Sequence, residues 1–559
     1  MIRTERLQSL VAGPRGMAGG GLSRALLLLP ALLLVLLAAA PILAIFGYLG
    51  SGADGIWGHL VQTVLFEYLW NSLLLCLGVA LLAGVIGAGC AWLVTMYRFP
   101  GRNLFVWALF LPLAMPAYVL AYAYTDFFDV AGPVQTTLRA VTGWSVRDYP
   151  FFEIRSLGGA VFVLSMALYP YVYALARAAF VEQSQCALEV SRTLGCTGWS
   201  AFQRVGLPLA RPAVAAGLSF VVMETLADFG AVSFFGVPTF TTGIYRAWYG
   251  LSSPAAAAQL SSLLLAFVLL VFVAERMLRG RARFAANTIH IYRKQLPALR
   301  GAPAWLATAA CSAAVFSGFL LPAAILLAML GDGLETVSVS RLAELLQNTV
   351  LLGASAALLL VAAALSVLFA VRREGGPVAR LLLRLATLGY AVPGAVIGVG
   401  ILLVLTSADR LLAGLLAHRG LILSGTLVAV LYGYLVRFFA VAYNPLDAGW
   451  TKIGPHLGDA ARTLGHRPLE TFLRVQLPLL RPAVLGALLL VFVDVMKELP
   501  ATLILRPFDF DTLAIEAYRL ATTERLDGAA LPSLLIVLVG LAPVVMLCRM
   551  TEGRRAAVR

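Results

Sequence analysis

The chain has 559 residues, of which 60% are hydrophobic and 13% are charged, and its mean hydropathy is +0.89. A water-soluble domain carries roughly twice that charged fraction, so the composition excludes an ordinary soluble globular protein. The formal net charge of +14 is spread over short segments beside apolar stretches. This distribution favours anionic lipid as the partner and argues against nucleic acid.

The apolar stretches predict an all-α polytopic membrane protein. Each is long enough to cross ~30 Å of hydrocarbon as a helix, and none has the alternation over ~10 residues that is typical of a membrane barrel. The twelve predicted spans cover, in chain order, about 25–48, 71–96, 104–127, 157–180, 212–236, 255–275, 303–329, 348–371, 381–407, 421–445, 482–505 and 529–548.

The positions of the basic residues predict the orientation of the chain. With the N-terminus in the cytoplasm, 29 of the 42 Lys and Arg residues lie in cytoplasmic segments, ten lie outside, and three lie within spans (Arg177, Arg437 and Lys497). Basic residues concentrate on the cytoplasmic side, so both termini, 1–24 and 549–559, are predicted to be cytoplasmic. The alternative for the N-terminus is a cleavable signal peptide, although its apolar run is longer than a usual signal core.

The titratable residues give no sign of resident catalytic chemistry. The six cysteines form no C-x-x-C pair and the five histidines are scattered, so we predict neither a disulfide framework nor a stable metal site. None of the three lysines follows a glycine, as a phosphate-binding P-loop requires. We therefore expect no enzyme activity and no cofactor bound by this chain, because a membrane-embedded enzyme needs a converging nucleophile, base or metal cluster.

One polar segment occurs twice, between apolar stretches. Residues 189–214 (EVSRTLGCTGWSAFQRVGLPLARPAV) and 459–484 (DAARTLGHRPLETFLRVQLPLLRPAV) are identical at 14 of 26 positions. The similarity extends to other parts of the chain, and the further pairs are Asn71-Ser72 with Asn348-Thr349, Pro116 with Pro393, Tyr169-Pro170-Tyr171 with Tyr432-Gly433-Tyr434, and ETLADFG (224–230) with DVMKELP (494–500). The repeat predicts two six-span halves in parallel orientation.

These pairs set the predicted domain limits. The first half covers 25–278 with a cytoplasmic loop at 182–211, and the second covers 303–548 with a loop at 452–481. A basic cytoplasmic linker, 279–302, joins them.

Each repeated loop is predicted to be a helix–turn–helix that projects from the membrane. Gly195 tolerates the left-handed conformation that ends a helix, and a second helix would run from about Thr197 until Pro208 stops it. The alternative is an amphipathic helix lying on lipid. Lipid binding would not require the same Gly and Pro spacing in both copies.

The spacing of an acidic residue, Gly, Phe and Val-x-Leu-Pro resembles the cytoplasmic coupling loop of ABC importer permeases. The matching residues are Glu189, Gly195, Phe202, Val205, Leu207, Pro208 and Pro212, then Asp459, Gly465, Phe472, Val475, Leu477, Pro478 and Pro482. The family motif begins Glu-Ala-Ala, whereas this chain has Glu-Val-Ser and Asp-Ala-Ala.

The resemblance implies a fused permease of the bacterial inner membrane. Its two loops would dock on two ABC ATPase subunits in the cytoplasm, with Glu189 and Asp459 facing them. ATP hydrolysed by these partners would then swing the halves between inward-open and outward-open states.

Charges within the spans are candidates for the translocation pathway, because they are costly in a membrane and usually functional. Glu224 and Asp228 share one helical face, as do Asp494 and Glu498, and Lys497 lies between the latter two. Their net negative charge favours a cation. A hard cation such as ferric iron prefers carboxylate and phenolate oxygen, and the nearby candidates Tyr245, Tyr249 and Tyr518 carry phenol groups. The alternative is that Lys497 pairs with Asp494 and that Arg177 or Arg437 neutralises the remaining acids.

Residues 224–250 and 494–521 also resemble the fused permeases of bacterial ferric iron importers. That resemblance implies a periplasmic substrate-binding protein that delivers the ion, with transient ferric contacts at the four acids. Thiamine, polyamines, sulfate and phosphonate remain alternative substrates. A secondary transporter is the competing class, but it would not need two matched cytoplasmic loops.

Overall fold

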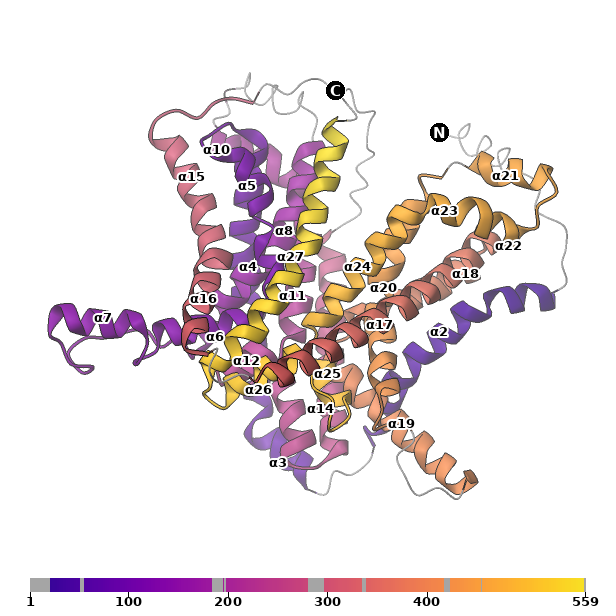
Figure 1. Cartoon of the computed structure of the whole chain (residues 1–559), viewed down its shortest axis with the longest axis horizontal. Coiled ribbons are helices and arrows are strands. Elements are labelled where there is room, and N and C mark those ends of the chain that lie inside the picture. The colour runs from indigo at the N-terminus through magenta and orange to yellow at the C-terminus, as the bar shows by residue number, and fades with distance from the viewer. Residues whose placement is uncertain are drawn as a thin grey trace.

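A computed structural model describes residues 21–50, 55–182, 195, 198–279, 296–333, 338–416, 423–453 and 455–556. This part of the chain is helical and contains no strand, apart from one isolated bridge between Arg98 and Ala298. The predicted all-α class is therefore confirmed. Figure 1 shows long helices grouped into two bodies that diverge towards one end of the molecule.

The helices of the first half alternate between long spans and short segments. They are α2 (Gly21–Gly47), α3 (Ile56–Thr63), α4 (Leu65–Met96), α5 (Arg102–Ala108), η1 (Leu111–Ala114), α6 (Ala117–Phe128), α7 (Pro133–Thr142), α8 (Leu157–Glu182), α10 (Gly198–Ala201), η2 (Phe202–Gly206), α11 (Leu207–Ala227), α12 (Gly230–Phe234), α13 (Phe240–Tyr245), η3 (Arg246–Gly250) and α14 (Pro254–Arg279).

The second half repeats this order. Its helices are α15 (Ala302–Val315), η4 (Phe316–Leu320), α16 (Leu321–Gly333), α17 (Val339–Glu374), α18 (Pro377–Thr387), η5 (Leu388–Ala391), α19 (Gly394–Leu416), α20 (Leu427–Trp450), α21 (Pro455–Thr463), α22 (Pro468–Thr471), η6 (Phe472–Gln476), α23 (Leu477–Leu479), α24 (Arg481–Lys497), α25 (Pro500–Leu505), α26 (Leu513–Thr522) and α27 (Leu526–Ala556).

The described residues include 10 helices long and apolar enough to cross a membrane, or up to 12 if each of two bent pairs is one span. Four predicted spans are wrong as continuous helices, namely 104–127, 212–236, 381–407 and 482–505. Two break before the equivalent prolines Pro116 and Pro393, which cannot donate the N–H that a continuous helix needs. The other two break at Asp228 and Glu498, whose backbone is extended.

The first span of each half packs against the other half. Helix α2 contacts α17, α18 and α19, while α15 and α16 contact α4, α5 and α6. The two sequence halves are thus interwoven, and each large hydrophobic core contains residues from both. The predicted limits of the two halves therefore describe the sequence repeat, and they stay a prediction as structural domains.

Candidate functional site

A cavity of about 180 Å³ lies between the halves, and all four helix breaks line it. Pro116 comes from the break before α6, and Tyr390 from the one before α19. Asp228 and Glu498 come from the ends of α11 and α24. Irregular backbone at membrane depth is tolerated where it lines a cavity, and such breaks commonly mark substrate sites.

Asp228 and Glu498 cap the short helices that follow them. Asp228 Oδ1 accepts hydrogen bonds from the amides of Ala231 and Val232, both at 3.1 Å. The Glu498 carboxylate accepts from the amides of Ala501 and Thr502, both at 3.0 Å. Carboxylates satisfy the orphan N–H groups and complement the dipole at a helix N-terminus. Their first role is therefore to hold α12 and α25 in place.

Glu224 and Asp494 also line the cavity, and they are the repeat-related pair that precedes these caps by one helical turn. The hydroxyl of Tyr390 donates to Glu224 Oε1 at 3.0 Å, across the two halves. Both acids are partly exposed, as is Asp228. Unlike Asp228 and Glu498, they do not cap a following helix, so their carboxylates are not occupied in that way.

The two cations in the cavity have their own partners. Lys497 Nζ donates to the carbonyl of Leu113 at 2.7 Å, which ties α24 to η1. Arg437 Nε lies 3.9 Å from Glu498 Oε1, so Arg437 offsets part of that acid's charge. The alternative that Lys497 pairs with Asp494 and that an arginine neutralises the remaining acids stays an alternative, with Arg437 placed beside Glu498.

Tyr245 and Tyr518, which were also predicted for the pathway, line a different cavity together with Tyr249. The Tyr245 hydroxyl donates to the carbonyl of Pro500, and the Tyr518 hydroxyl lies 3.0 Å from Ser233 Oγ. The central cavity and this outer cavity have no lining residue in common. These tyrosines therefore do not line the central cavity with the acids, and their role in the pathway stays a prediction.

The described helices of the repeated polar segments, α10 in the first and α21 and α22 in the second, lie towards one end of the molecule, away from α12, α25 and α26 (Figure 1). Gly195 and Gly465 have φ angles of +80° and +86°, the left-handed conformation that the sequence predicts. Asp459 is exposed on α21. Glu189 lies outside the described residues, so its placement stays a prediction.

Pro208 does not end the helix, which corrects the sequence prediction. A π-helical turn, η2, precedes it, and the helix continues through α11 to Ala227. The wider turn places the proline at the start of α11, where its missing N–H is tolerated. In the second copy η6 is also π-helical, and α23 with Pro478 follows it.

The equivalent phenylalanines anchor both segments to the membrane helices. The Phe202 ring lies 5.2 Å from Trp92 and 6.5 Å from Phe180, centroid to centroid. The Phe472 ring lies 5.1 Å from Phe369 and 5.9 Å from Trp450. A force on either segment would therefore reach the spans through a packed aromatic contact. Leu207 begins α11, which continues to Ala227, whereas Leu477 begins the three-residue α23, which is followed by α24 after a bend of 74°.

Comparison with known proteins identifies the family. The family model described as "Binding-protein-dependent transport system inner membrane component" matches residues 80–283 and 362–555. The chain belongs to this family. Its two matches correspond to the two repeats, so the protein is a fused ABC transporter permease that crosses the membrane several times.

Several curated permeases are similar to the chain. The Fe(3+)-transport system permease protein FbpB 2 of Haemophilus influenzae is 27% identical over 86% of this chain and 89% of its own length. The ferric transport system permease protein FbpB of Actinobacillus pleuropneumoniae is 26% identical over 84% and 68%. The sulfate transport system permease protein CysT of Escherichia coli is 32% identical, but over only 34% of this chain and 68% of its own.

Two features of this permease escaped the sequence analysis. Tyr390 contributes a hydroxyl to the cavity, and its only sequence signal is its position three residues before Pro393. The other is that all four breaks meet at one cavity. Within the described residues, no group of three or more His, Cys, Asp and Glu side chains is placed to hold a metal ion.

Proposed function

We propose that this chain is the membrane permease of an ATP-driven importer that carries ferric iron from the periplasm to the cytoplasm. Two ATPase subunits would dock on the segments around Gly195 and Gly465, and a periplasmic binding protein would deliver the ion to the opposite face. The ferric relatives, which cover most of the chain, support this substrate.

The observation that carries the proposal is the pair Glu224 and Asp494. They come from equivalent positions of the two halves, line one cavity, and do not cap a helix as Asp228 and Glu498 do. Hard cations prefer carboxylate oxygen. A site with only two carboxylates would also bind the ion weakly enough for it to leave, as a translocation pathway requires.

Sulfate is the competing substrate, since sulfate permeases match one half of the chain and Lys497 lines the cavity. An anion binds readily at a free helix N-terminus. Here the N-termini of α12 and α25 are already occupied by the carboxylates of Asp228 and Glu498. This arrangement favours a cation over an anion.

The loops would transmit ATPase closure through rigid contacts. Phe202 and Phe472 are each buried among aromatic rings of the membrane helices, so movement of a loop would move its half. Closure of the two ATPases would bring the loops together and rotate the halves. This motion is the alternating access that we propose.

The decisive experiment is uptake of radiolabelled ferric iron in cells that lack their own ferric importer. The permease would be co-expressed with the ATPase and binding protein encoded beside it. Glu224→Gln with Asp494→Asn should lower uptake at least about tenfold, which corresponds to ~1.4 kcal/mol. The matched control is Glu67→Gln, which changes an exposed acid on α4.

Three outcomes separate the alternatives. Iron uptake that needs the ATPase and falls only in the double variant supports the whole proposal. Sulfate uptake without iron uptake would overturn the ferric assignment while leaving the permease role. Uptake that survives ATP depletion but not loss of the proton gradient would indicate a secondary transporter.

A further inference from the structure

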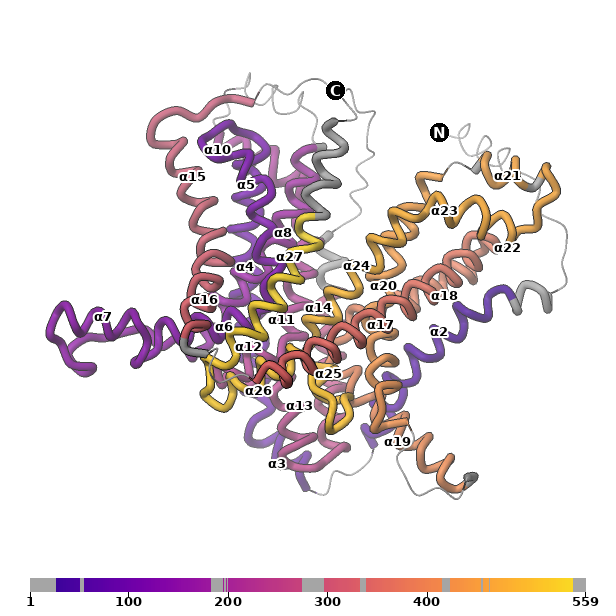
Figure 2. Tube along the Cα trace, in the orientation of Figure 1, coloured from indigo at the N-terminus to yellow at the C-terminus, as the bar shows by residue number. Residues whose placement is uncertain are grey.

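A second cavity, of about 410 Å³, lies beyond the central one on the side away from the coupling segments. Its lining includes Phe229, Ser233, Tyr245, Tyr249 and Tyr518. Figure 2 shows α12, α13, α25 and α26 at that end of the molecule. Phe229 follows Asp228, which lines the central cavity, so the two cavities are neighbours along one chain segment.

A layer of aromatic rings stands at the junction of these cavities. The rings of Phe229 and Tyr245 are stacked with centroids 3.6 Å apart, and Tyr518 lies 5.6 Å from Phe229. Phe229 and Tyr245 are buried, with 4% and 6% of their surface exposed. Pro500 lines the central cavity and accepts the hydrogen bond from the Tyr245 hydroxyl. The layer therefore reaches from one cavity to the other.

Three hydroxyl groups in this layer bridge the two halves. Tyr245, in the first half, donates to the carbonyl of Pro500, and the neighbouring Tyr249 donates to the carbonyl of Leu503 at 3.0 Å. Tyr518, in the second half, pairs with Ser233 Oγ of the first. Together these contacts close the seam between α13 and α25 and between α12 and α26.

Two of the bridges are related by the internal repeat. Tyr245 and Tyr518 each precede an arginine, and each lies six residues after the threonine that caps its helix. Each tyrosine reaches the short helix that follows the acidic cap of the opposite half, α25 for Tyr245 and α12 for Tyr518. A reciprocal pair of this kind closes a path symmetrically around the axis between the halves.

We propose that Phe229, Ser233, Tyr245, Tyr249 and Tyr518 form the outer gate of the permease, and that the structure has this gate closed. The inference rests on the proposed transport role, but not on iron as the substrate. The phenol hydroxyls are engaged with protein acceptors across the seam. They therefore act as a latch between the halves, and the earlier prediction that they bind the ion as phenolates gives way to this role.

The chemistry suits a gate that must open repeatedly. A hydrogen bond between neutral groups has a net contribution that shifts the equilibrium between the closed and open gate only roughly fivefold. A few such bonds therefore favour the closed gate and still allow it to open. The stacked rings exclude water while the gate is closed. The five gate residues themselves carry no formal charge, so none of them exposes or buries a charge when the rings part.

The test is the accessibility of the central cavity from outside. A cysteine-free permease carrying Ala227→Cys places one thiol in the lining of the central cavity. In spheroplasts, a membrane-impermeant maleimide should label it slowly. Adding Tyr245→Phe and Tyr518→Phe removes two bridges while keeping the rings, and should speed labelling roughly 25-fold, or fivefold for each hydrogen bond.

The matched control is Tyr173→Phe. This change also removes a buried tyrosine hydrogen bond, to the carbonyl of Val106 at 2.9 Å, but both partners lie in the first half. Its labelling rate should equal that of the parent. Rapid labelling of the parent, an unchanged rate in the double variant, or an equal increase in the control would each overturn the gate. Faster labelling in a protein that carries no iron would leave the gate standing and reject only the substrate.

Discussion

The outer ends of the two halves share one backbone clamp but differ in charge. In the first half, Asn71 Nδ2 donates to the carbonyl of Pro238 at 3.1 Å, and the Ser72 hydroxyl accepts from the amide of Phe240. In the second half, Asn348 donates to the carbonyl of Asp511 at 3.1 Å, and Thr349 accepts from Leu513. The same two contacts thus dock α13 on α4 and α26 on α17.

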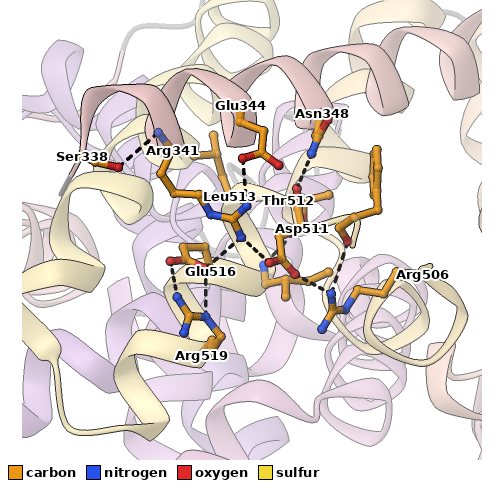
Figure 3. A network of polar contacts seen from close by, with 12 residues as sticks. Ser338, Arg341, Glu344, Asn348, Arg506, Asp511, Thr512, Leu513, Glu516 and Arg519 are labelled. Carbon is orange, nitrogen blue, oxygen red and sulfur yellow. Dashed lines mark hydrogen bonds and ion pairs between the residues drawn. The ribbon is translucent and has the colours of Figure 1, made fainter. Parts of the chain in front are cut away.

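The second half adds an ionic network to this clamp (Figure 3), and the residues that the structure describes show no ion pair equivalent to those of Asp511 in the first half. Asp511 forms an ion pair with Arg341, and its Oδ1 atom lies 2.5 Å from Nη1 of Arg506. Glu516, which is 5% exposed, pairs with Arg519 at 2.6 Å. The first half has Gly243 where the second has Glu516, and a Cβ there would lie 2.5 Å from the Tyr68 ring.

The difference shows which contacts set geometry and which only add strength. The amide and hydroxyl contacts recur in both halves, so they determine where the gate helices lie. In the second half the ion pairs of Asp511 and Glu516 add to these contacts at α26. We therefore expect α26 to be held more strongly than α13.

The largest effect on uptake is expected at Gly195 and Gly465, the coupling glycines, which have the same left-handed conformation in both halves. Proline fixes φ near −65°, which is incompatible with the +80° of Gly195 and the +86° of Gly465. Gly195→Pro with Gly465→Pro should abolish ATP-driven uptake while the protein remains in the membrane, as an immunoblot would check. Gly55→Pro changes a left-handed glycine at the other end and should retain uptake. Normal uptake by the double variant would remove the coupling assignment.

A smaller effect is expected where the halves differ in charge. Asp511→Asn removes the carboxylate that Arg341 and Arg506 share, while Arg341 keeps its ion pair with Glu344. The loss should lower the free energy of unfolding by about 2 kcal/mol, because hydrogen bonds to charged groups are stronger than those between neutral groups. Thermal unfolding of the permease in nanodiscs would measure it. The exposed Asp509→Asn should have little effect. Equal melting of both variants would mean that the ionic network adds nothing to stability.

The cavity offers a way to make the halves more alike. Lys497 corresponds to Ala227 in the repeat, so Ala227→Lys adds a further positive charge to the cavity, which already contains Lys497 and Arg437. Uptake of a cation should fall about tenfold, which corresponds to ~1.4 kcal/mol, because the added lysine would repel the cation in the cavity. Ala227→Leu controls for size. An increase in cation uptake would contradict the proposed role of the acids.

The smallest effect is expected at the shared clamp. Asn71→Ala and Asn348→Ala each remove one hydrogen bond to a backbone carbonyl, and each should cost about 1 kcal/mol of stability. The two losses should be similar and additive in the double variant, because the sites are separate. A much larger loss for Asn348→Ala, measured by the same melting experiment, would show that the ionic network depends on it.

The sequence predicted the fold well where local patterns decide it. Hydropathy predicted the spans, and the repeat predicted the two halves and the left-handed glycines. The sequence did not predict the helix breaks at Asp228 and Glu498. In the sequence these residues are only charges within a span, and their capping of backbone amides is visible only in the structure. The sequence also could not predict that Tyr245 and Tyr518 bridge the halves, since that pairing depends on long-range packing.

Fusion of the two halves has a consequence for the charge of the cavity. In a permease built from two identical chains, every cavity side chain would occur twice around the axis, and the net charge would always be even. Here one gene encodes both copies, so Lys497 stands opposite Ala227 and contributes a single positive charge. A fused chain can therefore adjust its cavity by one unit of charge, a step that a homodimer cannot take.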